Sequence, residues 1–307
     1  MKKGEIYEGT VERIEFPNKG VVMIDGEKAI VKNALPGQKI RFRINKKRGG
    51  RCEGMLLEVV EHSKLETAED VCPHFGICGG CLYQPIPYEE QLAIKEKQVR
   101  SLLDAVCPEY EFEGILGSPL VQGYRNKMEF SFGDEVKDGP MSLGMHKRGS
   151  FYDVVTTGEC HIVHPDFCKI LVCTKEYFEE KKVGFYKKMQ HVGYLRHLLL
   201  RRANTTGEIL VNLVTTSQEE MELTPLKEAL LALDLEGKIV GFLHIINDGL
   251  SDMVRSDETR ILYGQEYFYE EILGLKFKVT PFSFFQPNSY GAEVLYNTAR
   301  EYLGSTK

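Results

Sequence analysis

The sequence predicts a small all-β barrel of the OB type, followed by a cysteine-rich loop and a larger α+β domain. Three observations lead to this fold class. Short alternating segments fill residues 1–61, three cysteines fall within ten residues from Cys72, and helical and strand patterns are mixed beyond residue 110. A chain of 307 residues is long enough for roughly two domains.

Residues 1–61 are predicted to form short strands joined by tight turns. The dipeptide Asp25-Gly26 lies between two apolar segments, which is typical of a two-residue hairpin. Pro36-Gly37 marks a second turn, and Lys39–Ile44 alternates between charged and apolar residues as a strand with one buried face does. Several such strands in a short segment favour a closed barrel, a fold that commonly binds nucleic acid.

The charge of the chain is unevenly distributed. The whole chain carries a net charge of −6, but residues 1–61 carry +4 and the remainder −10. Residues 41–51 contain six basic residues and no acid. Such a segment can follow a phosphate backbone, and a solvated basic loop is the alternative. The candidate RNA-contacting residues of this segment are Arg41, Arg43, Lys46, Lys47 and Arg48.

Residues 62–110 are predicted to hold a linker, the cysteine loop and one helix. Residues 62–71 are polar and acidic, as a linker is. The helix is expected from Tyr88 to Val106, because Pro87 suits its first turn and Pro108 prevents its continuation. Its predicted apolar face consists of Leu92, Val99, Leu102, Leu103 and Val106.

Residues 111–287 are predicted to form the α+β domain. Leu195–Arg202 and Glu208–Thr216 indicate a hairpin, and residues 220–232 a helix. Ile239–Asn247 and Phe277–Thr280 indicate strands. The last segment, 288–307, contains an amphipathic helix over Asn288–Leu303, whose apolar face needs a partner surface.

The cysteine loop indicates a metal centre. Cys72, Cys78 and Cys81 follow the pattern C-x(5)-C-x(2)-C among three glycines, which permit tight turns and a close backbone approach. Structural zinc prefers pairs spaced C-x(2–4)-C, whereas a 4Fe–4S cluster accepts irregular spacing, so the pattern favours iron–sulfur over zinc. The fourth ligand could be Cys160 or Cys168.

The chain is expected to be cytoplasmic and not bound to a membrane. Its N-terminus lacks an apolar signal segment, and no apolar run approaches the roughly 20 residues that cross a bilayer. Eight cysteines in such a chain favour metal ligation and buried thiols over disulfides.

Several motifs together resemble the bacterial S-adenosylmethionine-dependent RNA uracil-5-methyltransferases, in the family's order and over nearly the whole chain. Residues 4–61 resemble a TRAM domain, a small RNA-binding barrel. Cys72–Cys81 with the following Tyr88–Lys95 resembles the family's iron–sulfur segment. The most specific further match is Pro281-Phe-Ser-Phe-Phe-Gln-Pro-Asn288. Supporting matches are Tyr124–Lys127, Leu143–Arg148, Cys160-His-Ile and Leu195-Arg-His.

The resemblance implies a 4Fe–4S cluster on Cys72, Cys78, Cys81 and Cys160. It also implies 23S ribosomal RNA as the substrate, since the family's tRNA members usually lack the TRAM domain and the cluster. Gln286 stands where the family contacts S-adenosylmethionine, and Phe284 where it stacks an aromatic ring on RNA bases. Core packing is the alternative for Phe284, and it is expected for Phe282 and Phe285. Asn288 is placed to cap the last helix.

The chain departs from the family because no strand–glycine-rich turn–helix unit follows the last helix. The resemblance implies a cysteine that adds to carbon 6 of uracil and a carboxylate base, both in a Rossmann-like domain. We therefore expect a truncated chain, the N-terminal RNA-recognition part of the enzyme, monomeric and inactive alone, and name no catalytic residue. The alternative is a non-catalytic RNA-binding protein that holds an iron–sulfur cluster or zinc.

Overall fold

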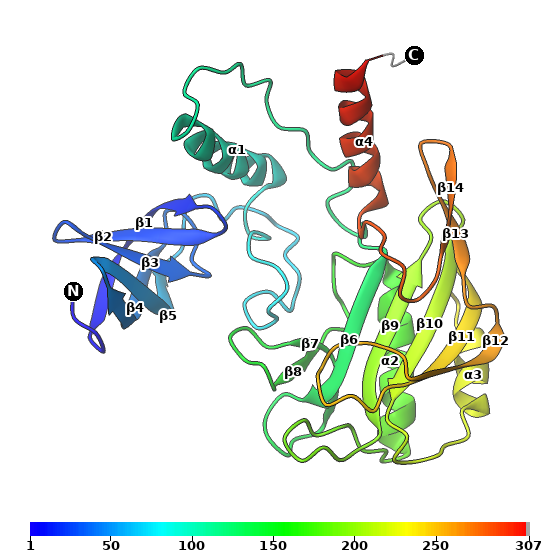
Figure 1. The fold of residues 1–307 in the computed structure, drawn as a ribbon. Coiled ribbons are helices and arrows are strands. Elements are labelled where there is room, and N and C mark those ends of the chain that lie inside the picture. Colours follow the sequence, from blue (N-terminus) through cyan, green and yellow to red (C-terminus); the bar gives the residue numbers. More distant parts are fainter. Residues whose placement is uncertain (305–307) are drawn as a thin grey trace. The chain divides into compact units, whose positions relative to one another are not determined.

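The computed structural model describes residues 1–304. The chain divides into two compact units, shown in Figure 1. The first consists of Met1–Val71 and Cys81–Gly117; the second consists of Cys72–Gly80 and the chain from Ser118 onward. The boundary therefore passes through the cysteine loop, and most of this loop belongs to the second unit.

The first unit contains the predicted barrel, closed in the order β1-β2-β3-β5-β4. Its strands are β1 (Ile6–Glu15), β2 (Lys19–Ile24), β3 (Glu27–Lys32), β4 (Lys39–Arg48) and β5 (Arg51–Glu61). Asp25 and Gly26 both have positive φ between β2 and β3, which confirms the predicted turn. The apolar residues of β4 point into the barrel and its charged residues outward, as alternation predicts.

Helix α1 (Tyr88–Asp104) confirms the predicted helix, but the predicted apolar face is wrong. Val99, Leu102 and Leu103 are exposed, whereas Ile94 and Gln98 are buried. Ile94 joins the core of the barrel unit, so a different face of the helix is covered. Helical spacing identified a mainly aliphatic face, but the face buried by tertiary packing is a different one, which contains Ile94 and Gln98.

The second unit contains a seven-stranded sheet in the order β12-β11-β10-β9-β6-β7-β8. All neighbouring strands are antiparallel except β10 and β11, which are parallel. The strands are β6 (Lys127–Asp134), β7 (Met141–His146), β8 (Val154–Thr156), β9 (Leu195–Arg202), β10 (Glu208–Thr215), β11 (Lys238–Ile246) and β12 (Glu258–Gly264). The predicted hairpin is β9–β10, and the predicted strand near residue 240 is β11.

Two helices and a hairpin pack against this sheet (Figure 1). Helix α2 (Pro165–Glu180), which the sequence patterns missed, and helix α3 (Thr224–Leu231) supply apolar residues to the sheet's main core. The second hairpin, β13 (Phe268–Ile272) and β14 (Leu275–Val279), contributes to a separate core cluster with β10 and β11. Each face of the sheet is therefore covered by different elements.

Strand β9 contributes side chains to both faces of the sheet. Leu198 and Leu200 belong to the core shared with the helices. Because side chains alternate along a strand, His197 and Arg201 lie on the opposite face. Both are buried polar residues, so they must find partners in the loops that cross that face.

The last helix, α4 (Ser289–Leu303), begins where the sequence predicted. The side-chain oxygen of Asn288 accepts a hydrogen bond of 2.9 Å from the backbone N–H of Gly291, which confirms the predicted cap. Leu295, Tyr302 and Leu303 are exposed on this helix. Among the described residues, no helix is both long and apolar enough to cross a membrane.

Candidate functional site

The loop between β14 and α4 carries the two predicted site residues Phe284 and Gln286. Its first half is held by one buried guanidinium group, that of Arg201 on β9. Nη1 of Arg201 donates to the carbonyl oxygens of Thr280, Pro281 and Ser283 at 2.5, 3.1 and 2.8 Å. Three acceptors on one cation fix the path of this segment, because a charge-assisted hydrogen bond is stronger than a neutral one.

Arg201 is 1% exposed, and burial lowers the pKa of its guanidinium to about 10. A group with this pKa keeps its charge at neutral pH. The charge faces backbone carbonyl oxygens instead of water, and a buried cation requires such acceptors. The loop therefore needs the guanidinium as a hydrogen-bond donor, and the buried guanidinium needs the carbonyl oxygens of the loop as acceptors.

The second half of the loop is held by Asn126, which precedes β6. Its side-chain amide donates to the carbonyl oxygen of Gln286 and to Oγ of Ser289, both at 2.9 Å. Its backbone N–H also donates to the carbonyl oxygen of Pro287 at 2.8 Å. Asn126 thus fixes the backbone at Gln286, the residue predicted to contact S-adenosylmethionine.

Glu270 on β13 anchors the start of α4. This carboxylate is buried and accepts hydrogen bonds from the backbone N–H groups of Asn204 and Thr205 at 2.7 and 3.1 Å. Oγ of Ser289 donates to it at 3.1 Å. Sequence reasoning missed both Glu270 and Arg201, although Asn126 lies within a segment that matched the family.

Phe284 is 87% exposed on this well-anchored loop. Among residues 1–304, Phe284 therefore does not pack in a core. Phe285 does pack as predicted, with its ring 5.8 Å from that of Phe277 and edge-on to it. Core packing was the wrong prediction for Phe282, which is 46% exposed. The loop presents an aromatic face to solvent from a fixed backbone.

The basic segment of the barrel is more neutralised than its sequence indicates. Arg41 pairs with Glu58 and Glu8 on the neighbouring strands at 2.5 and 3.2 Å. Lys47 pairs with Glu27 at 2.8 Å. Glu8 and Glu58 lie on the two strands that pair with β4, and Glu27 lies on β3, so a count over residues 41–51 does not reveal them.

Lys46 also has an acidic neighbour, since its Nζ lies 3.5 Å from Glu53. Arg43 and Arg48 are exposed and take part in no ion pair among those described. These two arginines therefore carry the strongest uncompensated positive charge of the predicted set.

Three of the four predicted cysteine ligands lie close together in the second unit. Burial raises the pKa of the Cys160 thiol, and the neighbouring Cys72 and Cys78 raise it further. Burial also raises the pKa of the Cys78 thiol, against the effect of the Gly80 backbone N–H, which donates to Cys78 Sγ at 3.3 Å. Cys81 belongs to the first unit.

Two side chains of the cysteine loop contact the backbone of Glu159 in the second unit. Sγ of Cys72 lies 3.8 Å from the carbonyl oxygen of Glu159, and the N–H of Glu159 donates to Nε2 of His74 at 3.2 Å. Three thiols near one another with a glycine N–H aimed at a sulfur suit a thiolate-ligated group. Among residues 1–304, however, no group of three or more His, Cys, Asp or Glu side chains is arranged to hold a single metal ion.

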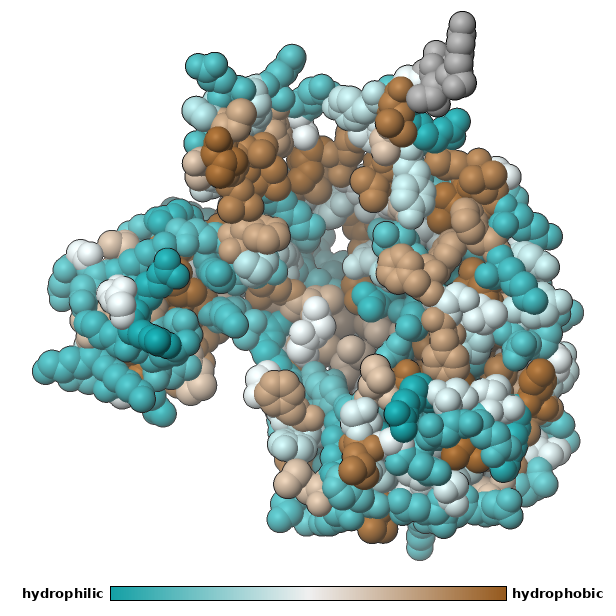
Figure 2. Space-filling view, in the orientation of Figure 1, coloured by the Kyte–Doolittle hydropathy of each residue, from teal (hydrophilic) through white to brown (hydrophobic). Residues whose placement is uncertain are grey.

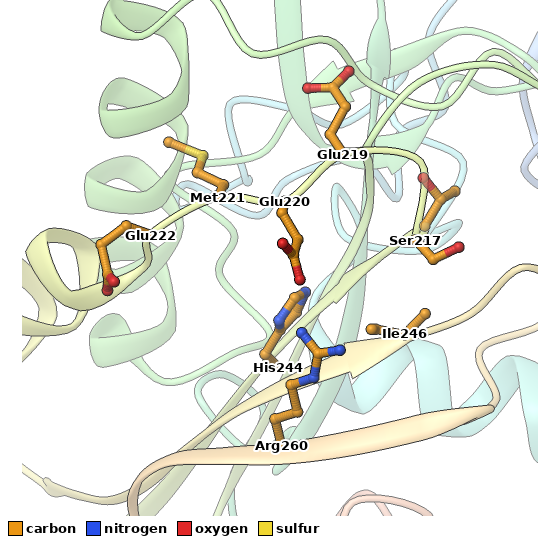
Figure 3. Close-up of a pocket in the computed structure, with 9 residues that line it drawn as sticks. Ser217, Glu219, Glu220, Met221, Glu222, His244, Ile246 and Arg260 are labelled. Atoms are coloured by element: carbon orange, nitrogen blue, oxygen red, sulfur yellow. The ribbon is translucent and has the colours of Figure 1, made fainter.

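A cavity of about 440 Å³ lies beyond the carboxyl ends of the parallel strands β10 and β11, and Figure 3 shows its lining. The Glu220 carboxylate points toward His244 and Arg260 in this view. Nε2 of His244 shares a hydrogen bond of 2.8 Å with Oγ1 of Thr215, and Arg260 forms a salt bridge of 2.6 Å with Glu258. The lining includes several carboxylates, which would repel phosphate groups, and it includes none of the predicted site residues.

No protein-family model matches the chain. The chain is 50% identical over 305 residues to an uncharacterized RNA methyltransferase of Clostridium acetobutylicum, a match that covers 99% of this chain and 67% of the relative. A relative with the same description from Clostridium tetani is 47% identical over 308 residues, a match that covers 100% of this chain and 67% of the relative. The chain thus spans about two thirds of the length of these relatives.

The fold is similar to that of a tRNA (uracil-54, C5)-methyltransferase of Pyrococcus abyssi, whose crystal structure contains S-adenosyl-L-homocysteine. The TM-score is 0.72 and the identity 24%, over 97% of this chain and 65% of the other. At this identity the similarity establishes the fold.

Proposed function

The chain belongs to the family of RNA methyltransferases, and from that premise we propose that it takes part in methylating carbon 5 of uridine in 23S ribosomal RNA. The methyl donor in this proposal is S-adenosylmethionine, and the location is the cytoplasm. The observation that carries the proposal is Phe284, an exposed ring on a loop anchored by Arg201 and Asn126.

Phe284 is proposed to stack on an unpaired RNA base beside the target. A base stacked on an aromatic ring contributes roughly 1–3 kcal/mol to binding. The anchored backbone lowers the entropy lost on binding, because the ring is already held where the base must meet it. Gln286 is proposed to contact S-adenosylmethionine, and its backbone is fixed by Asn126.

The barrel is proposed to add a second, electrostatic contact. Arg43 and Arg48 face solvent without ion pairs among the described residues, so they can take RNA phosphates without breaking an existing contact. We assign the nucleophile and the base to no residue of this chain.

The cysteines are proposed to hold a 4Fe–4S cluster. The proposed ligands are Cys72, Cys78 and Cys160, which all belong to the second unit, and Cys81, which comes from the sequence pattern. When bound, the cluster would tie the cysteine loop to the segment at Cys160. Methyl transfer itself requires no electron from it, so its proposed role is structural.

The cluster proposal is tested by iron and sulfide analysis of anaerobically purified protein, followed by thermal unfolding. About four irons and four sulfides per chain support it. Cys160→Ala is expected to lose iron and to unfold at a lower temperature, whereas Cys107→Ala, which changes an exposed thiol, should do neither. One zinc per chain without sulfide would favour the zinc alternative.

The activity is tested with tritiated S-adenosylmethionine and unmodified RNA transcripts. Label recovered as 5-methyluridine from 23S ribosomal RNA supports the proposal, and label recovered only from tRNA refutes the ribosomal substrate. RNA binding without any methyl transfer fits both the expected truncated chain and the alternative, a non-catalytic RNA-binding protein; a reading frame that continues past residue 307 into a glycine-rich turn favours the first. Phe284→Ala should weaken RNA binding about tenfold, whether or not methyl transfer is detected.

A further inference from the structure

Three loops of the second unit bring exposed hydrophobic side chains together. The loop between β7 and β8 carries Phe151 and Tyr152, the segment before β9 carries Met189, and the loop between β11 and β12 carries Leu250 and Met253. Phe151 is 85% exposed and Met189 75%. Figure 2 shows brown and tan side chains among hydrophilic ones where the loop after β11 crosses the sheet. We call these five residues the three-loop platform.

Direct contacts join the three loops. Nζ of Lys188 donates to the Asp252 carboxylate at 2.6 Å and to the carbonyl oxygen of Phe151 at 3.4 Å, so one ammonium group touches two of the other loops. The hydroxyl of Tyr152 lies 3.7 Å from the sulfur of Met189. The three loops are therefore neighbours in space, and Tyr152 and Met189 contact each other directly.

The sheet beneath also holds the longest of these loops in place. Arg196 on β9 donates to the carbonyl oxygens of Asn247, Gly249 and Ser251 at 2.7, 2.6 and 2.7 Å. Asp252 lies 3.5 Å from both His146 and His197. Buried anchors thus fix the loop that carries Leu250 and Met253, and Asp252 joins that loop to Lys188. Exposed apolar surface held in place usually marks an interaction site.

The two segments that carry Phe151, Tyr152 and Met189 are the basic part of the platform. Residues 147–153 and 187–192 together carry four basic residues and a single acid, Asp153, whereas residues 247–257 carry three acids and one arginine. RNA phosphates are therefore expected along the first two segments. Lys147 pairs with Glu135 at 3.6 Å, and Lys187 with Asp138 at 3.0 Å. Ion pairs this exposed stabilise a protein little, so a phosphate can replace the carboxylate at small cost.

We propose that the three-loop platform is a second contact for single-stranded RNA, separate from the loop of Phe284. Phe151 and Tyr152 stack on unpaired bases outside the target nucleotide, and Lys147 and Lys187 take the adjacent phosphates. This inference rests on the proposed function, since it needs RNA as the partner. It adds a surface on which flanking nucleotides are held while the target base is out of its stack.

The test uses the 307-residue chain and a fluorescent single-stranded RNA of about 20 nucleotides, with binding followed by anisotropy. Replacing both rings, in Phe151→Leu with Tyr152→Leu, keeps apolar side chains but removes stacking. We expect the affinity to fall about tenfold or more. Phe151→Trp should bind like the unchanged protein. Leu231→Ala, which changes an exposed leucine at the end of α3, is the matched control.

The outcomes separate this inference from the proposed function. A double variant that binds RNA within twofold of the unchanged protein overturns the inference, while weaker binding by Phe284→Ala in the same assay leaves the proposed function standing. An unchanged protein that binds no RNA overturns both. A second measurement is the slope of log affinity against log salt concentration. Lys187→Gln should reduce this slope, by less than the roughly 0.7 of an unpaired cation, because Asp138 already neutralises part of its charge. An unchanged slope would count against that contact.

Discussion

Replacing Arg201 by methionine should release the loop that carries Phe284. The methylenes of methionine fill similar space, but the three carbonyl oxygens of Thr280, Pro281 and Ser283 lose their donor. A hydrogen bond to a charged group contributes about 1.5–3 kcal/mol, and water can replace part of it at the less buried oxygens. We therefore expect a loss of about 3–5 kcal/mol in the free energy of unfolding of the second unit.

Thermal unfolding and limited proteolysis can both detect the loss of this anchor. A loss of that size in a domain of about 200 residues lowers the melting temperature by roughly 6–20 °C. Chymotrypsin cleaves after exposed phenylalanine, so it should cut at Phe284 slowly in the unchanged protein and faster in Arg201→Met. Arg201→Lys keeps the charge but loses the planar group. Its melting temperature and its rate of cleavage should therefore lie between those of the unchanged protein and Arg201→Met.

The control is Arg260→Met, which removes an exposed arginine paired with Glu258. It should shift the melting temperature by no more than about 2 °C, because exposed ion pairs contribute little. If Arg201→Met melts within 2 °C of the unchanged protein and resists chymotrypsin equally, the loop is held by other contacts and the reasoning is wrong.

Three further predictions concern other residues. Burial lowers the pKa of His197 to about 4, so the unfolded chain binds the proton more readily. Stability should fall as pH drops from about 6.5 toward 4, by about 2 kcal/mol between pH 7 and 5, and His197→Gln should flatten that part of the profile in urea titrations. Arg43→Gln and Arg48→Gln should each reduce the salt slope of RNA binding by about 0.7, and Arg41→Gln, whose charge is already paired, by less; equal effects would contradict the neutralisation argument. Asn288→Ala should destabilise α4 by about 1 kcal/mol, measured by thermal unfolding, and no change would mean that the cap contributes nothing.

The barrel could be predicted because its signals are local. The turn at Asp25-Gly26 and the alternation of β4 each depend on a few adjacent residues, and both match the structure. The buried face of α1 could not be predicted from periodicity, since the barrel packs on Ile94 and leaves Val99 and Leu102 exposed. Periodicity shows which faces could be buried, and only the tertiary partner selects one.

The ion pairs of the basic segment could not be predicted for a related reason. Arg41 meets Glu8 and Glu58 only because β4 lies between β1 and β5. Strand order brings together charges that are 17 and 33 positions apart in the chain. A basic run in a β-protein therefore indicates a nucleic-acid surface only after the neighbouring strands have been identified.

Strand β9 anchors both the loop of Phe284 and one loop of the three-loop platform, and this is the strongest structural argument that the two surfaces are functional. Arg196 and Arg201 are five residues apart on β9, and each donates to three carbonyl oxygens of a long loop. Burying a guanidinium is costly, and burial lowers the pKa of both. A loop needed only to connect two elements could be shortened without such anchors. Both anchored loops carry exposed hydrophobic side chains. A ligand that requires those side chains at fixed positions explains the anchors better.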